Sequence, residues 1–261
     1  MIKLIASDLD GTLLQNDAQQ LSEQVVPYIR KLKEMGIIFV AASGRQYANL
    51  QRLFEPVKDE IAYICENGAL VVYKGQVLHK TVIDKEIGEE ILVDIRKREG
   101  CEILLSGMNT SYLEPKTNEY AHRMQYIVKN NVTIVKDILN VTEDYLKISV
   151  YERDGINHSK DYFQKKWSDK VTVVTSGTAW LDMISLGTNK GSAMKVLQEK
   201  FAILPEETMA FGDNYNDVEL LSNVSYSYAM NSGKKDIIKL CKYSVDRVEE
   251  ILEKVINGEI S

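Results

Sequence analysis

Short apolar runs in the first part of the chain alternate with a segment of helical pattern. The runs that predict buried strands occupy residues 2–7, 37–42 and 61–65. Between the first two runs, Val25, Ile29 and Leu32 recur at the spacing of one helix face. The expected helix starts near Ser22, Gly36 marks its end, and Pro27 is expected to delay or kink its first turns. Strands that alternate with helices predict a parallel sheet.

The pattern changes in the middle of the chain and then returns. Helical patterns around residues 86–98, 118–128 and 156–167 are interleaved with strand-like runs at residues 102–105, 111–114, 146–151, 171–175 and 180–184. Simple alternation resumes with a helix over residues 191–200, a strand over 208–211, a helix after residue 217, and strands over 226–230 and 243–245. We therefore expect a core domain of residues 1–81 and 186–261, with an α+β domain of residues 82–185 inserted into it.

Polar turns follow the predicted core strands. They are Asp8-Leu9-Asp10-Gly11-Thr12, Ser43-Gly44-Arg45, Glu66-Asn67-Gly68 and Gly212-Asp213-Asn214-Tyr215-Asn216-Asp217. In an open parallel sheet, ligands bind outside the carboxyl ends of the strands. The turns are therefore expected to meet at one edge of the sheet and to form the binding site there.

Asp8 and Asp10 flank a single residue, so at a strand end both side chains can project toward the same space. Two carboxylates in one place repel unless a cation or a proton is shared between them. A hard divalent cation such as Mg²⁺, which takes oxygen ligands, is the natural partner. A turn or helix-capping pair is the alternative reading. A calcium loop is excluded because Leu13 occupies the place of its glycine and Gln19 that of its glutamate.

The remaining motifs contain further polar and charged residues, and each of these has more than one possible role. Asp213 is a candidate metal ligand, whereas Asp217 either lies next to the metal site or caps the following helix. Ser43-Gly44 offers a hydroxyl and accessible backbone N–H groups to a phosphate, although such a turn alone is weak evidence. Arg45 is a candidate for a residue next to the site, although an arginine at this position is more often a surface or sheet-edge salt-bridge residue than a ligand contact. Lys190 lies at a predicted helix start, where the helix dipole disfavours a cation. A solvated surface role is therefore less natural for Lys190.

Composition limits the class of protein. The 32 basic and 38 acidic residues give a net charge of −6, which argues against a nucleic-acid-binding surface. Cys65, Cys101 and Cys241 lie far apart without a CxxC pair, so neither a disulfide framework nor a zinc site is indicated. The N-terminal run turns acidic at Asp8, too early for a signal peptide, and no stretch approaches the ~20 apolar residues of a membrane span. We expect a cytoplasmic protein without a membrane partner.

Together, the first two turns, Lys190-Gly191 and the turn at residues 212–217 resemble the four ordered motifs of the haloacid dehalogenase-like hydrolase superfamily. Within this superfamily, the chain most closely resembles the Cof-type sugar-phosphate phosphatases. Their type IIB α+β cap is inserted after the third strand, which is where the pattern changes in this chain. This resemblance implies a Rossmann-like three-layer α/β core with a cap that selects the substrate. Ser43 replaces a frequent threonine and Asn231 a usual glycine, and neither change removes a catalytic group.

The resemblance also implies a role for each motif residue. Asp8 would be the nucleophile that forms an aspartyl-phosphate, and Asp10 the general acid and then the general base. Mg²⁺ would be held by the Asp8 carboxylate, the Asp10 backbone carbonyl and Asp213. The expected phosphate-binding groups are Leu9, Ser43, Gly44, Lys190 and Asn216. The substrate would be a small phosphorylated metabolite.

Two other functions stay open on these motifs. A phosphomutase of the same superfamily would return the phosphoryl group to a sugar, and a sensor would bind the metabolite without reaction. In the inserted domain, the polar residues that could read the leaving group are Tyr112, Lys116, His122 and Arg123, although a structural role is expected more often for each. Trp167 and Trp180 are expected in its core. No hydrophobic stripe predicts an oligomeric state.

Overall fold

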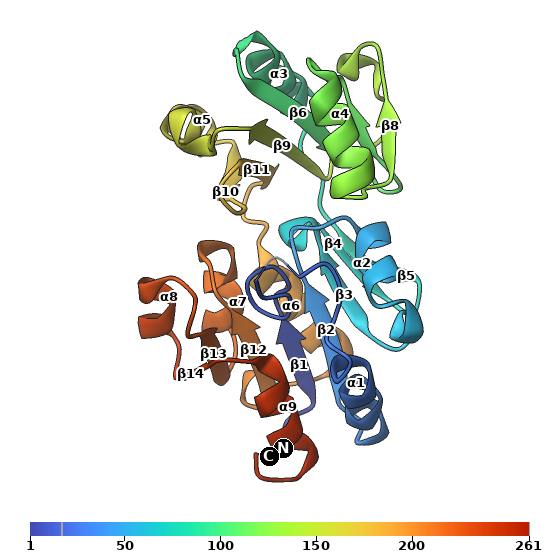
Figure 1. Cartoon of the computed structure of the whole chain (residues 1–261), viewed down its shortest axis with the longest axis vertical. Coiled ribbons are helices and arrows are strands. Elements are labelled where there is room, and N and C mark those ends of the chain that lie inside the picture. The colour runs from blue at the N-terminus through green and yellow to red at the C-terminus, as the bar shows by residue number, and fades with distance from the viewer. Residues whose placement is uncertain (17, 261) are drawn as a thin grey trace. The chain divides into compact units, whose positions relative to one another are not determined.

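The computed structural model of the chain describes residues 1–16 and 18–260 (Figure 1). Its residues form two compact units. The first consists of Met1–Gly44, Leu50–His79 and Asn189–Ser261, and the second of Arg45–Asn49 and Lys80–Thr188. The segment 82–185, which the sequence pattern sets apart, lies within the second unit. Among the described residues, no helix combines the length and apolar character needed to cross a lipid bilayer.

The first unit is built on one sheet with the strand order β14-β13-β12-β1-β2-β3-β4-β5. Its strands are β1 (Leu4–Ser7), β2 (Ile38–Ala42), β3 (Ala62–Cys65), β4 (Leu70–Tyr73), β5 (Gln76–Lys80), β12 (Thr208–Gly212), β13 (Tyr226–Met230) and β14 (Tyr243–Val245). From β14 to β3 all neighbours are parallel, whereas β4 runs antiparallel to β3. The predicted parallel sheet is thus correct for its centre, and the sequence pattern did not predict β4 and β5.

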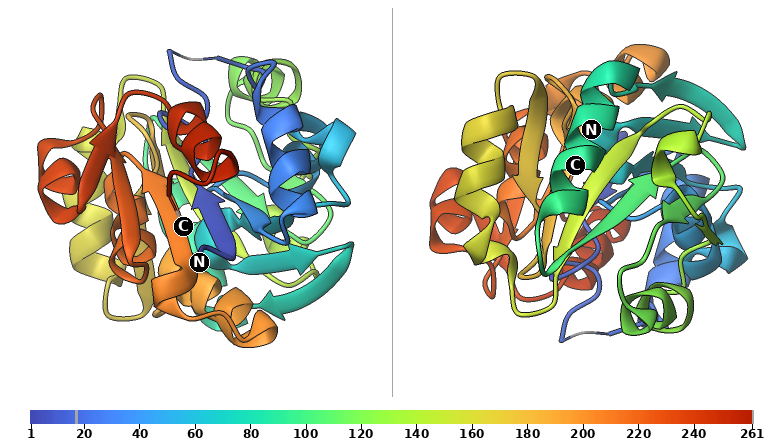
Figure 2. Two further views of the ribbon diagram at one scale, coloured as in Figure 1. Left: turned by 90° about the horizontal axis from the view of Figure 1, so that it is seen from below. Right: turned by 90° about the horizontal axis from the view of Figure 1, so that it is seen from above.

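Helices cover both faces of this sheet (Figure 2). They are α1 (Val25–Glu34), α6 (Lys190–Phe201), α7 (Val218–Ser222), α8 (Lys235–Leu240) and α9 (Val248–Ile256), while α2 (Tyr47–Leu53) has residues in both units. Sheet residues such as Leu4 and Val40 share a core with Met194 and Leu197 of α6 and with residues of α7 and α8. On the opposite face α1 contacts α9. The N-terminus and the segment that follows α9 lie side by side (Figures 1 and 2).

Helix α1 begins at Val25 rather than at Ser22, and this start explains how it accommodates Pro27. Pro27 lies in the first turn, where a backbone N–H has no acceptor within the helix, so the missing donor costs no intrahelical hydrogen bond. Val25, Ile29 and Leu32 are buried, as their spacing predicts. The helix ends at Glu34, close to Gly36, which adopts a positive φ of 80°.

The second unit has its own sheet, with the strand order β10-β11-β9-β6-β7-β8. Its strands are β6 (Cys101–Ser106), β7 (Ser111–Leu113), β8 (Val132–Ile134), β9 (Lys147–Glu152), β10 (Val171–Thr175) and β11 (Trp180–Ser185), and its helices are α3 (Lys85–Lys97), α4 (Asn118–His122) and α5 (Lys160–Trp167). Residues of α3 and α5 pack with Ile148 and Val150 on one face. On the other face, Tyr120 of α4 packs with Leu104 and Tyr151.

Asp94 joins α3 to α5 inside the second unit. Its carboxylate accepts hydrogen bonds from Tyr162 Oη at 2.8 Å and Trp167 Nε1 at 2.9 Å, and it lies 2.9 Å from Lys166 Nζ. Burial by itself would raise the pKa of Asp94, but the bonds from Lys166, Trp167 and Tyr162 outweigh it and lower the pKa below its ordinary value. Trp167 is buried in the core, as expected.

We predict that Asp94→Ala lowers the free energy of unfolding at pH 7 by about 1–3 kcal/mol, because the buried Trp167 N–H loses its acceptor. Since folding lowers the pKa of Asp94, the stabilisation from its charge is complete above the unfolded pKa of about 4 and is lost as the pH falls through the folded pKa. Urea unfolding followed by tryptophan fluorescence measures this, because both tryptophans lie in the second unit. The exposed Asp169→Ala is the control, and equal stability of the two variants would contradict the prediction.

Candidate active site

The loops that follow four parallel neighbours, β12, β1, β2 and β3, meet at the carboxyl edge of the first sheet. Asp213 follows β12, Asp8 follows β1, Ser43 follows β2, and Asn67 lies in the turn after β3. Ser7 is paired with Phe211 in register, and the N–H of Asp8 continues the ladder by donating to the Phe211 carbonyl at 3.0 Å. The residues that the sequence places at strand ends are therefore brought to one edge.

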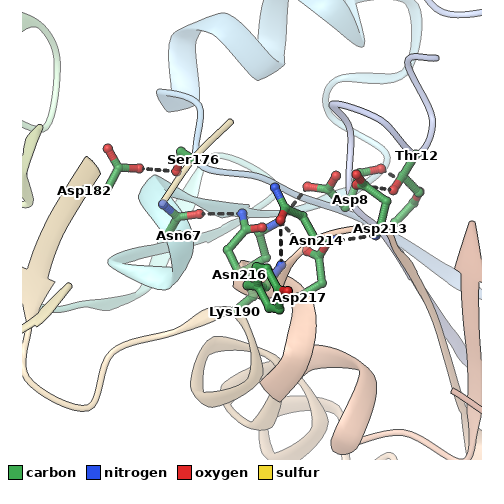
Figure 3. A network of polar contacts seen from close by, with 12 residues as sticks. Asp8, Thr12, Asn67, Ser176, Asp182, Lys190, Asp213, Asn214, Asn216 and Asp217 are labelled. Atoms are coloured by element: carbon green, nitrogen blue, oxygen red, sulfur yellow. Dashed lines mark hydrogen bonds and ion pairs between the residues drawn. The ribbon is translucent and has the colours of Figure 1, made fainter. Parts of the chain in front are cut away.

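Lys190, drawn in Figure 3, supplies a cation at this edge. Its side chain is fully buried. Its Nζ lies 2.5 Å from Asp8 Oδ1 and 2.7 Å from Asp217 Oδ1. Lys190 is the first residue of α6, which begins with a capping box between Asn189 and Ser192. Burial by itself would lower the pKa of Lys190, but Asp217 and Asp8 outweigh it and raise the pKa. Lys190 is thus held as an ammonium ion.

Asp8 lies in an excess of negative charge. Burial and the nearby carboxylate of Asp217 raise its pKa well above the ordinary value, although Lys190 acts in the opposite direction, and Asp213 and Asp10 raise it further. Only 5% of the Asp8 surface is exposed. A buried carboxylate in this environment favours a partner that supplies positive charge.

Asp213 completes the acidic group. Its Oδ1 accepts a hydrogen bond of 3.0 Å from the Thr12 hydroxyl, which belongs to the turn after Asp8 (Figure 3). Burial and Asp217 raise the pKa of Asp213 above its ordinary value. Among the described residues, one carboxylate oxygen each from Asp8, Asp213 and Asp217 lies within 4.8 Å of the others.

Asp217 does not cap the following helix, because among the described residues its side chain makes no cap hydrogen bond to α7. Instead, its Oδ2 accepts the backbone N–H groups of Asp213 at 3.0 Å and Asn214 at 3.2 Å, and the second of these bonds is half of a capping box with Asn214. Its Oδ1 binds Lys190, as given above. Asp217 therefore fixes the Asp213 loop and the buried cation together. Because both of its oxygens are engaged, Asp8 and Asp213 are the better-placed carboxylates for a metal ion.

Two glycines allow these close approaches. A Cβ on Gly212 would lie 2.6 Å from the Cβ of Asp217, so any side chain there would displace the carboxylate. A Cβ on Gly191 would come within 2.5 Å of the Glu219 backbone, where α6 packs on α7. Glycine after Lys190 is therefore explained by helix packing, a reason that the motif alone does not reveal.

The other predicted site residues occupy less central positions. Leu9 and Ser43 are buried, whereas Asp10 is exposed. The half-buried Asn216 donates from Nδ2 to Asn67 Oδ1 at 3.2 Å. Arg45 is half-buried, in a segment grouped with the second unit. Sequence reasoning placed the Asn67 turn at this edge without assigning a residue in it, and it missed Thr12. The signal was available for both, since each lies in a polar turn after a strand.

In the second unit, the polar residues suggested as leaving-group readers make contacts within the unit. Tyr112 donates to Glu143 Oε2 at 2.7 Å, and Lys116 Nζ donates to the Arg98 carbonyl at 2.6 Å. The His122 ring lies 4.8 Å from the ring of Tyr126. The guanidinium of Arg123 lies over the ring of Tyr151. Trp180 packs on Tyr151 with 4.7 Å between ring centroids, but it is only half-buried and borders the core instead of lying inside it as expected.

A different polar group, the Asp182 cluster, consists of Lys147, Ser149, Ser176 and Asp182. The hydroxyls of Ser149 and Ser176 each donate to the Asp182 carboxylate at 2.6 Å, and Lys147 Nζ lies 3.6 Å from it. Asp182 is 2% exposed and Lys147 6% exposed. Strand alternation puts Lys147 and Ser149 on the same side of β9 as Tyr151. Sequence reasoning missed this cluster because its members come from separate strands.

Comparison with known proteins identifies the family. A family model for haloacid dehalogenase-like hydrolases matches residues 5–252, and the chain therefore belongs to that family. The chain is 28% identical over 272 residues to the 5-amino-6-(5-phospho-D-ribitylamino)uracil phosphatase YbjI of Escherichia coli K12, which covers 99% of this chain and 97% of that relative. It is also 24% identical to the 5-amino-6-(5-phospho-D-ribitylamino)uracil phosphatase YcsE of Bacillus subtilis. That match covers 98% of this chain and 94% of the relative. The predicted family resemblance is thus confirmed.

The fold is shared with solved structures of the family. The subclass IIB sugar phosphatase BT4131 matches with a TM-score of 0.83 at 21% identity, over 99% of this chain and 100% of that one. The predicted α/β fold with a largely parallel sheet is confirmed. The family model describes hydrolases and the named relatives are phosphatases, and the chain is accordingly a phosphatase that hydrolyses phosphoric monoesters.

We predict that Asp217→Asn lowers kcat/KM for phosphate release by about 10- to 100-fold, the usual cost of removing a group that orients a reacting residue. The amide keeps the shape of the side chain but removes one of the two charges that hold Lys190. Steady-state kinetics with an aryl phosphate measures the effect, and the exposed Asp59→Asn serves as the control. A variant that melts at lower temperature yet keeps full activity would show that Asp217 only stabilises the loop at Asp213 and Asn214.

Proposed function

We propose that this phosphatase hydrolyses small phosphomonoesters by transferring the phosphoryl group to the Asp8 carboxylate and then to water, with the help of Mg²⁺. The observation that carries the proposal is the fully buried ammonium of Lys190, which lies between Asp8 and Asp217. An anionic nucleophile does not approach an anionic phosphate unaided, because their charges repel. A cation fixed against the nucleophile reduces that repulsion.

The donor set fits a magnesium ion. If all four groups are ionised, Asp8, Asp213 and Asp217 carry three negative charges against the one positive charge of Lys190, which leaves an excess of two. All of the carboxylate donors are hard oxygen atoms, the type that Mg²⁺ prefers. Asp8, Asp213 and the backbone carbonyl of Asp10 would hold the ion. When bound, it would neutralise charge on the phosphoryl oxygens.

The first step follows from the positions of Asp8 and Asp10 in one turn. An oxygen of the Asp8 carboxylate forms a bond to phosphorus, and the bond from phosphorus to the leaving oxygen breaks. Asp10 gives its proton to that leaving oxygen. In the second step Asp10 takes a proton from water, whose oxygen attacks phosphorus and releases Asp8 and inorganic phosphate. The exposed side chain of Asp10 suits a group that exchanges protons with the leaving group and water.

The phosphoryl oxygens need donors during both steps. We assign this task to Lys190, the Ser43 hydroxyl, the Asn216 amide and the backbone N–H groups of Leu9 and Gly44. Phosphoryl transfer requires chiefly alignment and neutralisation of the three non-bridging oxygens, so donors preorganised on buried loops contribute directly to the rate. Ser43 is 1% exposed and Lys190 is 0% exposed, which supports a preorganised arrangement.

We propose that residues 82–185 form the cap that selects the leaving group. The candidates from the sequence make contacts inside their own unit, so the Asp182 cluster is the better support for this role. Its buried carboxylate, ammonium and hydroxyls provide both hydrogen-bond donors and acceptors, the chemistry that a sugar or sugar alcohol requires. Two relatives are named for a phosphate ester of a ribityl chain, which places that class of substrate first for testing.

We expect phosphate release to require Mg²⁺ and to be abolished in Asp8→Asn, because the amide removes both the nucleophile and a metal ligand. The assay measures inorganic phosphate from 5-amino-6-(5-phospho-D-ribitylamino)uracil, a panel of sugar phosphates and an aryl phosphate, with added Mg²⁺ or with a chelator. Asp59→Asn is the control for an exposed aspartate. Release that persists in the chelator would contradict the metal, and release by Asp8→Asn would contradict the nucleophile.

Asp10→Asn is expected to slow turnover by about 10²- to 10⁴-fold, the usual contribution of a general acid or base. An aryl phosphate has a leaving group that needs little protonation, so the variant should still form the aspartyl-phosphate but hydrolyse it slowly. Mass spectrometry of the quenched variant should then detect a phosphoryl group on the peptide that contains Asp8. Full activity of Asp10→Asn would make the acid and base assignment wrong.

A further inference from the structure

The turn after β3 has a left-handed backbone beside the active site. Glu66 and Asn67 are consecutive non-glycine residues with φ values of 50° and 55°, and Gly68 follows with a φ of 107°. Left-handed backbone costs about 1–3 kcal/mol at a non-glycine residue when the surroundings enforce it, and such strain concentrates at functional sites. Glu66 is 1% exposed and Asn67 is 2% exposed. A buried, strained turn without an established role calls for a physical reason.

Backbone contacts show what holds the turn. The N–H of Asn67 donates to the Ser43 carbonyl at 3.1 Å, and the N–H of Ser43 donates to the Ile64 carbonyl at 2.8 Å. A Cβ on Gly68 would collide with the carbonyl oxygen of Asn189, the residue that caps the helix of Lys190. The turn is therefore in contact with two of the other loops that form the active site.

The side chain of Asn67 reaches the remaining groups. Its carboxamide lies against Gly44, where a Cβ would come within 3.0 Å of Oδ1 and 3.1 Å of Nδ2. Its Oδ1 also accepts the 3.2 Å hydrogen bond from Asn216 Nδ2 (Figure 3). This bond uses one N–H of Asn216 and fixes the plane of its amide, so that the second N–H and Oδ1 point in set directions.

We propose that Asn67 is a positioning residue for phosphoryl binding, which holds the amide of Asn216 and packs against Gly44. The inference rests on the proposed function, because Gly44 and Asn216 bind phosphate only in that proposal. Glycine would adopt the left-handed backbone at lower cost, so the backbone alone does not explain asparagine. The carboxamide explains the asparagine, because asparagine tolerates this backbone conformation and its Oδ1 accepts the hydrogen bond from Asn216.

The test removes the carboxamide and keeps the backbone conformation. In Asn67→Gly we expect the inhibition constant for inorganic phosphate and the KM for an aryl phosphate to rise about three- to tenfold, the effect of one lost hydrogen bond on binding. The melting temperature should stay close to that of the wild type, because glycine relieves the left-handed strain. Asn16→Gly is the matched control, since Asn16 is an exposed asparagine with a φ of 53°.

A double-mutant cycle separates this inference from the proposed function. If Asn67 acts through Asn216, Asn67→Gly should weaken phosphate inhibition little further in the Asn216→Ala background. Two outcomes would overturn the inference when Asn216→Ala by itself weakens phosphate inhibition. In one, Asn67→Gly shows normal phosphate inhibition. In the other, the losses of phosphate inhibition in the two single variants add up in the double variant. If Asn216→Ala binds phosphate normally, the proposed phosphate-binding set is wrong, and the inference falls with it.

Discussion

A buried ammonium ion organises this protein. An ionised amine without exposed surface is stable only if carboxylates surround it, because the loss of hydration costs several kcal/mol or more. Lys190 meets this condition through Asp8, which follows β1, and Asp217, from the turn after β12. The contacts tie together parts of the chain that lie 182 and 27 residues apart. The arrangement of the active-site loops depends on satisfying this one charge.

The carboxylates near Lys190 outnumber this one ammonium ion, and by our proposal the chemistry depends on the excess of negative charge. Asp8, Asp213 and Asp217 lie close together, and burial together with the charge of Asp217 raises the pKa values of Asp8 and Asp213, against the opposite effect of Lys190. In a structure built only for stability, such repulsion would be a defect. By our proposal, the same repulsion in this phosphatase favours a divalent cation, next to a carboxylate that is already held in place. The same electrostatics thus serve the fold and, by our proposal, the reaction.

The two units illustrate different uses of polar residues. In the first unit, capping boxes and short turns after parallel strands bring polar groups to one edge of the sheet. In the second unit, most polar side chains that looked available are engaged in holding the unit together, as Tyr112 is with Glu143. The Asp182 cluster differs because three strands or their adjoining loops contribute to it. Cross-strand register, rather than spacing along the chain, defines such a group.

The sequence by itself determined most of the alternation of strands and helices, because apolar periodicity and turn residues are local properties. The bounds of β13 and β14 agree with the apolar runs, and the polar turns at residues 8–12 and 212–217 do lie at strand ends. The family also follows from the sequence, since its motifs depend on residue type and order. The hairpin of β4 and β5 was not predicted. The strand β5 is largely exposed and carries little apolar pattern, whereas β4 is a buried apolar run that sequence reasoning missed.

Only the tertiary structure decided which polar residues meet. The sequence left Asp217 between two readings, and the structure decides against a cap of the following helix: its two oxygens bind Lys190 and the backbone N–H of Asp213 instead. Lys190 was expected to differ from a solvated lysine, yet its complete burial depends on the packing of α6 against α7 and the sheet. The contact between Asn67 and Asn216 joins residues 149 positions apart. Such contacts depend on how the sheet orders its strands, which local pattern does not encode.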